Sequence, residues 1–290
     1  MNTLRLIATT ILLITVSTCS AFSQEMKLGE NAALRYWSAF AQMQDSAITD
    51  EEATKLNGIL AGPVPYDDLK YKDLVEKNRK ALDTMAGGTV FANCDWGLDY
   101  RRGPDTPVDY VRKSLELGRL NVLYTFHLQI AGDKDGAVRV LAAGIRFSHD
   151  VANGGPLFAA LAAKDLLSTH FKAVGFLLHT GGLSAPQRAI LQKAAAQLGP
   201  MGLDWHSAAR RDLESLRGSV SQDSQATAAL EQISSAYMRA LSDPSALPAL
   251  QKLMTAAPQT VAQLIPNPKR VLEQKQEFTD QLSQIRSSLK

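Results

Sequence analysis

Cysteine, net charge and long apolar runs are all scarce in this chain, and each shortage excludes a class of protein. The 290 residues include two cysteines, Cys19 and Cys94, which excludes a cysteine-rich metal centre. The 31 basic and 29 acidic residues leave a net charge of +2, so the protein as a whole attracts neither nucleic acid nor anionic membranes strongly. Aromatic residues are not interleaved with basic ones as in a nucleic-acid surface. We expect no nucleic-acid partner.

Sequence motifs of common enzyme classes are missing as well. The chain has no HExxH zinc-protease motif, no GxSxG nucleophile motif, no phosphate-binding P-loop and no GxGxxG dinucleotide motif. The composition is otherwise that of an ordinary globular protein, with 45% hydrophobic and 21% charged residues. We expect no metal and no cofactor, and the sequence favours a non-catalytic protein without excluding an enzyme.

The first residues have the pattern of a secretory signal peptide. A short basic start is followed by an apolar run, Leu6 to Val16, and then by small residues at Ala21 and Ser23. The run is well below the ~20 residues that a transmembrane helix needs, and no later stretch is apolar enough to span. We expect residues 1–23 to be removed and the mature chain to be periplasmic or secreted, without a transmembrane segment.

A second interpretation of the leader depends on Cys19. The stretch Val16 to Cys19 loosely resembles a lipoprotein signal, in which the cysteine becomes the lipidated first residue, although Thr18 fits that pattern poorly. The protein is then anchored to lipid through Cys19. In both cases Cys94 is the one thiol of the folded part, so no internal disulfide forms, and we expect it to be a small buried side chain.

The chain after the leader shows the apolar periodicity of amphipathic helices, and strand-like alternation is rare. Ser184 begins a capping box, Thr106 and Pro107 have the pattern of a helix start, and glycines such as Gly132 fall where periodic runs end. The predicted helices are 26–46, 49–60, 66–86, 108–131, 135–152, 156–180, 184–198, 203–218, 223–242, 244–256 and 268–288.

Short loops place consecutive helices side by side in antiparallel order. The sequence therefore predicts an all-α fold of stacked antiparallel helical hairpins, either α-solenoid-like or an irregular bundle. The stacking is similar to that of tetratricopeptide proteins, but no fixed sequence period is present. We expect one helical domain over 24–290, with a candidate sub-boundary at 199–203.

A family resemblance supports this fold. The hairpins between Leu115 and Leu198, the stretch "CDWGLDY" and the closing "IPNPKRVLEQKQEF" resemble segments of a large class of exported bacterial proteins built from stacked helical hairpins. The likeness covers about two thirds of the chain and consists mainly of helical periodicity. It implies export and an all-helical fold, and it carries no catalytic residue.

Two histidines are candidate ligand-binding residues. His127 and His170 face the interior of their predicted helices, because apolar residues lie three and four positions away on both sides. If the helices 135–152 and 156–180 fold back on each other, both histidines lie close to the level of Arg139. They are then either a buried pair that binds a metal or titrates as a switch, or two separate core histidines.

The stretch "FANCDWGLDYRRGPDTP" at 91–107 is the other candidate. In a short helical turn, Asp95 and Asp99 share one face and can act as an acid–base pair or bind a cation. Arg101 and Arg102 can instead bind a carboxylate or phosphate. In the alternative interpretation, Trp96 anchors a packing loop and the charged side chains pair among themselves.

Together these patterns favour an exported binding or scaffolding module of the cell envelope, with an envelope protein or peptide as partner. Stacked hairpins form extended grooves without a catalytic constellation. The alternative is an envelope hydrolase that uses Asp95 and Asp99, with His127 as a further candidate. An acid pair in a concave pocket favours the hydrolase, and a self-paired surface favours the binding module.

Overall fold

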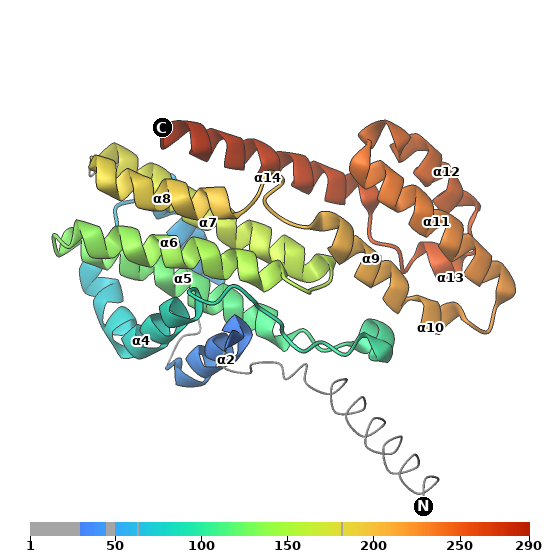
Figure 1. The fold of residues 1–290 in the computed structure, drawn as a ribbon, viewed down its shortest axis with the longest axis horizontal. Helices are drawn as coiled ribbons and strands as arrows, with labels where there is room; N and C mark the ends of the chain where they lie inside the picture. Colours follow the sequence, from blue (N-terminus) through green and yellow to red (C-terminus); the bar gives the residue numbers. More distant parts are fainter. Residues whose placement is uncertain (1–29, 45–49, 63, 181) are drawn as a thin grey trace, which may run out of the picture.

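The computed structural model describes residues 30–44, 50–62, 64–180 and 182–290 (Figure 1). The predicted signal peptide, 1–23, and Cys19 lie outside the described residues. Within those ranges, no helix combines the length and apolar character needed to cross a membrane.

Every regular element of the described residues is a helix, which confirms the prediction of an all-α fold. Most bounds agree with the prediction to within a few residues. The α-helices are α2 (Ala32–Gln42), α3 (Asp50–Leu60), α4 (Asp68–Gly88), α5 (Asp109–Ile130), α6 (Lys134–Ala152), α7 (Leu157–Thr180), α8 (Ala185–Gln197), α9 (Trp205–Ser215), α10 (Arg217–Val220), α11 (Ser224–Ser242), α12 (Leu247–Ala256), α13 (Gln259–Ala262) and α14 (Pro268–Ser288). Two short 3-10 helices, η2 (Tyr100–Asp105) and η3 (Pro244–Ala246), complete the set.

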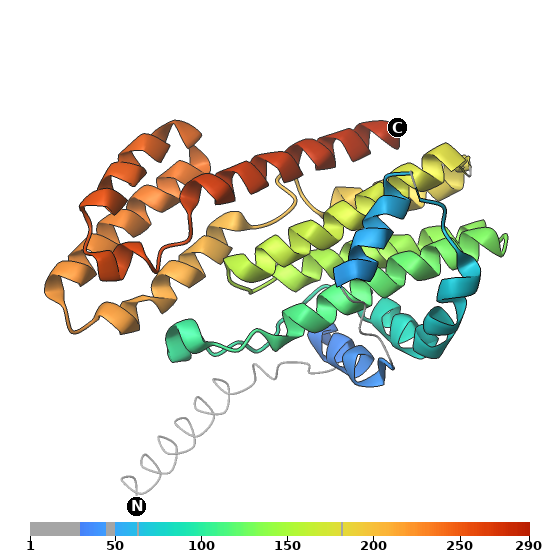
Figure 2. The ribbon, with the colours of Figure 1, turned by 180° about the vertical axis from the view of Figure 1, so that it is seen from behind.

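Helices α5, α6 and α7 form the centre of the molecule, and each packs against the next along the chain (Figures 1 and 2). Helices α2 and α4 pack together on one side of this centre, and α8 lies on α6. Helices α9 to α13 gather at one end of the molecule. Helix α14 then returns along α7 and α8, so the end of the chain covers its middle.

Helix α3 departs from the sequential order. It packs against α7, on the face seen in Figure 2, while its neighbours α2 and α4 pack on each other. Stacking of consecutive helices does not predict this position. The buried core follows the apolar periodicity of the helices more closely: Leu141, Ile145, Leu167 and Leu177 are fully buried, and Leu161 is half-buried.

Of the two helix starts predicted from capping residues, one is confirmed and one is wrong. Ser184 and Gln187 form the predicted capping box at the start of α8. Thr106 is not the N-cap of the next predicted helix, because α5 begins at Asp109 without a side-chain cap. The Thr106 hydroxyl instead donates to the Gly103 carbonyl at 2.8 Å and closes η2. The loop before α5 is therefore tighter and more ordered than its sequence suggests.

The sequence predicts that His170 and His127 lie at the same level along their helices. In the structure, His170 lies beside Asn121 instead. Its Nε2 is 3.1 Å from the Asn121 side-chain amide, and its Nδ1 is 2.7 Å from the Leu166 carbonyl oxygen. Asn121 precedes His127 by six positions, which is about 9 Å along a helix axis. The prediction placed His170 near Arg139, but His170 packs against Gly144, which lies farther along α6.

Close packing at α6 explains the surroundings of His170. A Cβ atom on Gly144 would collide with the side chains of Asn121 and His170, so only glycine fits at this position. Burial lowers the pKa of His170 to about 4, and the ring is therefore neutral at pH 7. His170 is a core histidine with polar partners of its own.

Gly144→Ala should destabilise the protein, because overpacking a buried site costs roughly 1–3 kcal/mol. Gly175→Ala is the matched control. Gly175 also lies inside a helix, but a Cβ atom there meets nothing, so the change should raise stability by about 0.5–1 kcal/mol. Urea unfolding of the two variants measures both effects. Equal effects at the two positions would contradict the packing described for His170.

Candidate functional site

The C-terminal end of α6 holds the loop that connects α4 and α5. The last carbonyl groups of an α-helix have no partner within the helix. Here the Asp150 carbonyl accepts hydrogen bonds from Trp96 Nε1 at 2.9 Å and from the Cys94 thiol at 3.7 Å. The Asn153 side chain donates to the Cys94 carbonyl at 3.0 Å. Cys94 is buried, as predicted, and burial raises the pKa of its thiol.

Two tyrosines extend this attachment. The Tyr110 hydroxyl donates to the Val151 carbonyl at 3.2 Å, and the Tyr100 hydroxyl donates to the Gly154 carbonyl at 2.6 Å. Burial raises the pKa of both phenols, to about 12 for Tyr100, so each keeps the proton that it donates. The Asp150 and Val151 carbonyl groups of α6, and the Gly154 carbonyl just after it, thus accept hydrogen bonds from side chains of the loop and of the start of α5.

The Asp150 side chain joins the same loop to α2. Asp150 is fully buried, and its Oδ2 accepts hydrogen bonds from the Tyr36 hydroxyl at 2.7 Å and from Arg146 Nε at 3.1 Å. Burial and the adjacent carboxylate raise the pKa of Tyr36, which therefore remains a donor. Arg146 Nη2 lies 3.4 Å from the Phe91 carbonyl oxygen and 3.3 Å from that of Ala92, to which it donates. One buried ion pair therefore contacts two separate segments.

Residues 90–97 run extended between these contacts, and we call this segment the groove wall. It has no neighbouring strand apart from one isolated bridge between Asn31 and Asn93. Asn31 replaces a strand partner: its Nδ2 donates to the Asp95 carbonyl at 2.8 Å, and its Oδ1 accepts from the Asp95 backbone N–H at 2.9 Å. The Ala32 N–H donates to the Asn93 carbonyl at 2.9 Å. The backbone groups of an isolated strand are paired here by side chains and a helix start.

Trp96 packs into an aromatic cluster below the groove wall. Its ring stacks on Tyr110 at a centroid distance of 4.1 Å and lies parallel to Phe40 at 6.2 Å. Tyr36 is 5.8 Å away. Only 6% of Trp96 is exposed. This burial agrees with the interpretation of the segment as a packing loop held by Trp96.

The two acids of this segment have different partners. Residues 91–98 form no helical turn, so Asp95 and Asp99 do not share a helix face. Asp95 Oδ1 accepts from the Gly97 N–H at 2.9 Å. Asp99 binds the guanidinium of Arg101 at 2.7 and 3.0 Å, and this hydrogen-bonded ion pair lowers the pKa of Asp99. Arg102 is exposed beside them.

His127 contacts two acids of α4 and not His170, the partner considered from the sequence. Its Nδ1 lies 2.8 Å from Asp68 Oδ1 and its Nε2 lies 3.5 Å from Glu76 Oε1, both on α4. His127 thus ties α5 to α4, whereas His170 belongs to the interface of α5, α6 and α7. In the part of the chain that the structure describes, no group of three or more potential metal ligands comes together.

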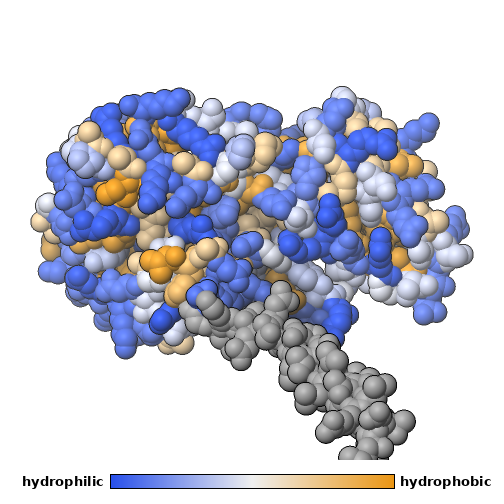
Figure 3. Space-filling view, in the orientation of Figure 1, coloured by the Kyte–Doolittle hydropathy of each residue, from blue (hydrophilic) through white to orange (hydrophobic). Residues whose placement is uncertain are grey.

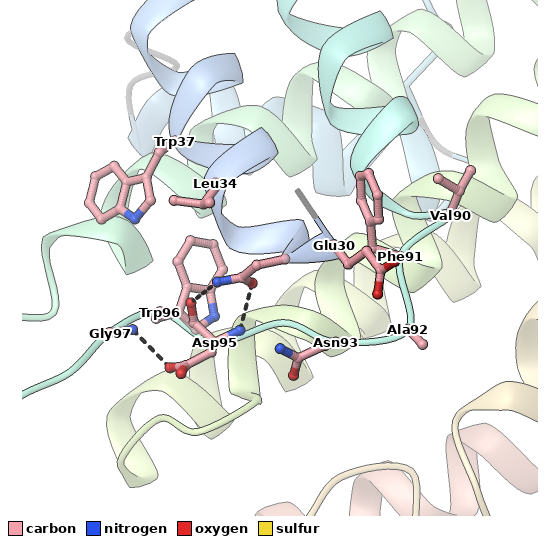
Figure 4. Close-up of a pocket in the computed structure, with 11 residues that line it drawn as sticks. Glu30, Leu34, Trp37, Val90, Phe91, Ala92, Asn93, Asp95, Trp96 and Gly97 are labelled. Carbon is pink, nitrogen blue, oxygen red and sulfur yellow. Dashed lines mark hydrogen bonds between the residues drawn. The ribbon is translucent and has the colours of Figure 1, made fainter. Parts of the chain in front are cut away.

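An apolar groove of about 690 Å³ lies between the start of α2 and the groove wall (Figure 4). Leu34 is 44% exposed, Trp37 is 42% exposed and Val90 is 78% exposed. Figure 3 shows apolar surface gathered where α4 ends and the groove wall begins. The lining residues are Glu30, Asn31, Leu34, Trp37, Val90, Phe91, Ala92, Asn93, Asp95, Trp96 and Gly97.

The charges of this apolar groove have one sign. Glu30 and Asp95 are acidic, and none of the lining residues is lysine, arginine or histidine. Trp37 and Leu34 supply exposed apolar surface between the helix and the wall. The groove can therefore accept an apolar side chain and, beside it, a positive charge.

No family model, curated protein or solved structure matches this chain. The chemistry of the apolar groove is consequently the guide to its ligand. Of the residues that the sequence singles out, Asp95 and Trp96 line the groove, whereas Asp99, Arg101, Arg102, His127 and His170 do not.

Leu34 and Trp37 are not among the site residues predicted from the sequence. A signal for them is nevertheless present in α2, because the helix is apolar on two faces. Ala33, Tyr36 and Phe40 form the buried face, while Leu34 and Trp37, three positions apart, form a second apolar stripe on the exposed face. A second apolar stripe on a short helix marks a surface that a partner can cover.

Trp96→Ala should destabilise the protein by roughly 3–5 kcal/mol, the usual cost of removing a buried large aromatic side chain. The variant also loses the hydrogen bond to the Asp150 carbonyl. Asp99→Asn is the control in the same segment, and it should change stability little because the ion pair with Arg101 is exposed. Urea unfolding measures both variants. A mild effect of Trp96→Ala would show that the groove wall is not anchored by this ring.

Proposed function

We propose that this protein is an exported, non-catalytic binding module of the cell envelope, and that its apolar groove binds a peptide segment with both apolar and basic side chains. The observation that carries this proposal is the lining of the groove. Leu34, Trp37 and Val90 are exposed around a hollow whose charged lining residues are Glu30 and Asp95.

The chemistry of the groove favours a peptide over a reacting substrate. An exposed tryptophan such as Trp37 is the type of side chain that dominates the binding energy of protein interfaces, and Leu34 adds apolar surface beside it. The Asp95 carboxylate of the groove selects for a partner with lysine or arginine and raises the rate of encounter. The alternative, hydrolysis by Asp95 and Asp99, has less support, because Asp99 pairs with Arg101 and does not line the groove.

Export is the second part of the proposal, and it rests on the leader sequence. Residues 1–23 combine a basic start, a short apolar run and small residues before Gln24. A chain exported in this way meets envelope proteins and peptides, which supplies a partner of the kind that the groove accepts. Anchoring through a lipidated Cys19 is the alternative state of the same exported protein.

Binding of a synthetic probe peptide tests the proposal. The probe carries a phenylalanine and a leucine flanked by lysines, and a matched control peptide carries glutamates in place of the lysines. Calorimetry and tryptophan fluorescence should show saturable binding of the basic peptide and much weaker binding of the acidic one. Asp95→Asn should weaken binding of the basic peptide severalfold, because it removes one of the two carboxylates that line the groove.

Leu34→Ala should weaken binding of the basic peptide by about tenfold, as expected for an interface anchor that contributes more than about 1 kcal/mol to the binding free energy. Leu264→Ala is its matched control. Leu264 is 43% exposed, almost the same as Leu34, but it does not line the apolar groove. Equal affinity for the two peptides, or equal effects of the two leucine variants, would overturn the proposed function.

A further inference from the structure

A second groove lies between α7, α8 and α14, away from the one described above. Its volume is about 540 Å³, within the range of small-molecule sites. Phe171 and Leu178 of α7 and Ile285 of α14 supply its apolar surface. The other lining residues are Ser168, Lys172, Gly175, His179, Arg188, Gln281, Gln284 and Ser288.

The charges of this second groove are opposite to those of the first. Lys172 and His179 come from α7 and Arg188 comes from α8, and no lining residue is acidic. Lys172 and Arg188 form no ion pair with an acid among residues 30–44, 50–62, 64–180 and 182–290. Arg188 Nε donates to the Leu183 carbonyl at 3.3 Å, which orients the guanidinium and leaves its other N–H groups for an anion.

A glycine keeps this groove open. Gly175 lies inside α7, where glycine costs roughly 0.5–1 kcal/mol relative to alanine. Packing does not require it, because a Cβ atom at Gly175 meets nothing within 4 Å. Gly144 of α6 and Gly118 of α5 differ, since a Cβ atom on either would collide with neighbouring side chains. The empty space above Gly175 belongs to the groove, so a side chain there would fill it.

We propose that the second groove binds a free fatty acid with a single alkyl chain, with its carboxylate at Lys172 and Arg188 and its alkyl chain over Gly175. Two cations without an acidic partner, in a groove that also has apolar side chains, select for an anion that carries an apolar tail. A single chain suits the volume, whereas a phospholipid with two acyl chains exceeds it. This site is independent of the peptide groove, and neither requires the other.

Displacement of a fluorescent fatty acid, dansyl-undecanoic acid, tests this proposal. Lauric acid should displace the probe. Dodecanol has a tail of the same length but no charge, and its affinity should be lower by at least about tenfold, because a hydrogen bond between charged groups is lost. Gly175→Leu should lower the affinity for the probe by tenfold or more, because the leucine side chain fills the groove. The melting temperature should not fall, since packing leaves this position open. Lys172→Gln should lower the affinity for lauric acid and leave the affinity for dodecanol unchanged.

Two controls separate the groove from general effects. Gly87→Leu adds the same side chain at another helical glycine with open space, and Lys252→Gln removes an exposed lysine outside the groove. Both should bind the probe as the unaltered protein does. Unchanged binding by Gly175→Leu, equal affinity for the acid and the alcohol, or displacement by phosphatidylglycerol vesicles and not by lauric acid would overturn the proposal.

Discussion

The buried carboxylate of Asp150, at the end of α6, holds together three parts of the protein that are distant in sequence. It accepts hydrogen bonds from Tyr36 of α2 and from Arg146 of its own helix, and Arg146 in turn binds carbonyl groups of the groove wall. A buried ion pair adds little net stability compared with an apolar replacement, but removing one partner costs about 3–5 kcal/mol because a charge is left without compensation. We infer that this pair specifies one arrangement of α2 against the wall.

The rest of the groove follows from this arrangement. The groove wall is an extended segment without a sheet, so its backbone groups need partners, and they find them in Asn31, Arg146 and Asn153. The aromatic cluster around Trp96 packs against the same segment and buries its largest side chain. Segments that bind ligands are commonly held by a rigid scaffold in this way. The exposed face of α2 then lies opposite a fixed wall, which creates the hollow.

Prediction from the sequence succeeds where structure is local and fails where it depends on distant partners. Helix positions follow from apolar periodicity, capping residues and glycine stops, all of which act within a few residues, and the burial of Leu141 and Leu167 follows from the same periodicity. The conformation of Asp95 depends instead on Asn31, 64 positions away. The level of His170 depends on how α6 and α7 pack against each other, with His170 beside Gly144. Neither is encoded in a short stretch of sequence.

Hydrogen exchange of an Asp150→Asn variant tests the role of the buried carboxylate most directly. The amide keeps the shape of the side chain but loses the charge that holds Arg146. The informative amides are those of Ala32 and Asp95, which bridge α2 and the groove wall, and those of α11 serve as the reference. The account predicts that exchange at Ala32 and Asp95 rises by about tenfold or more beyond any rise in α11, because the wall opens locally. Unchanged exchange rates at these two amides, or an equal rise in the exchange rates of α11, would contradict this role of Asp150.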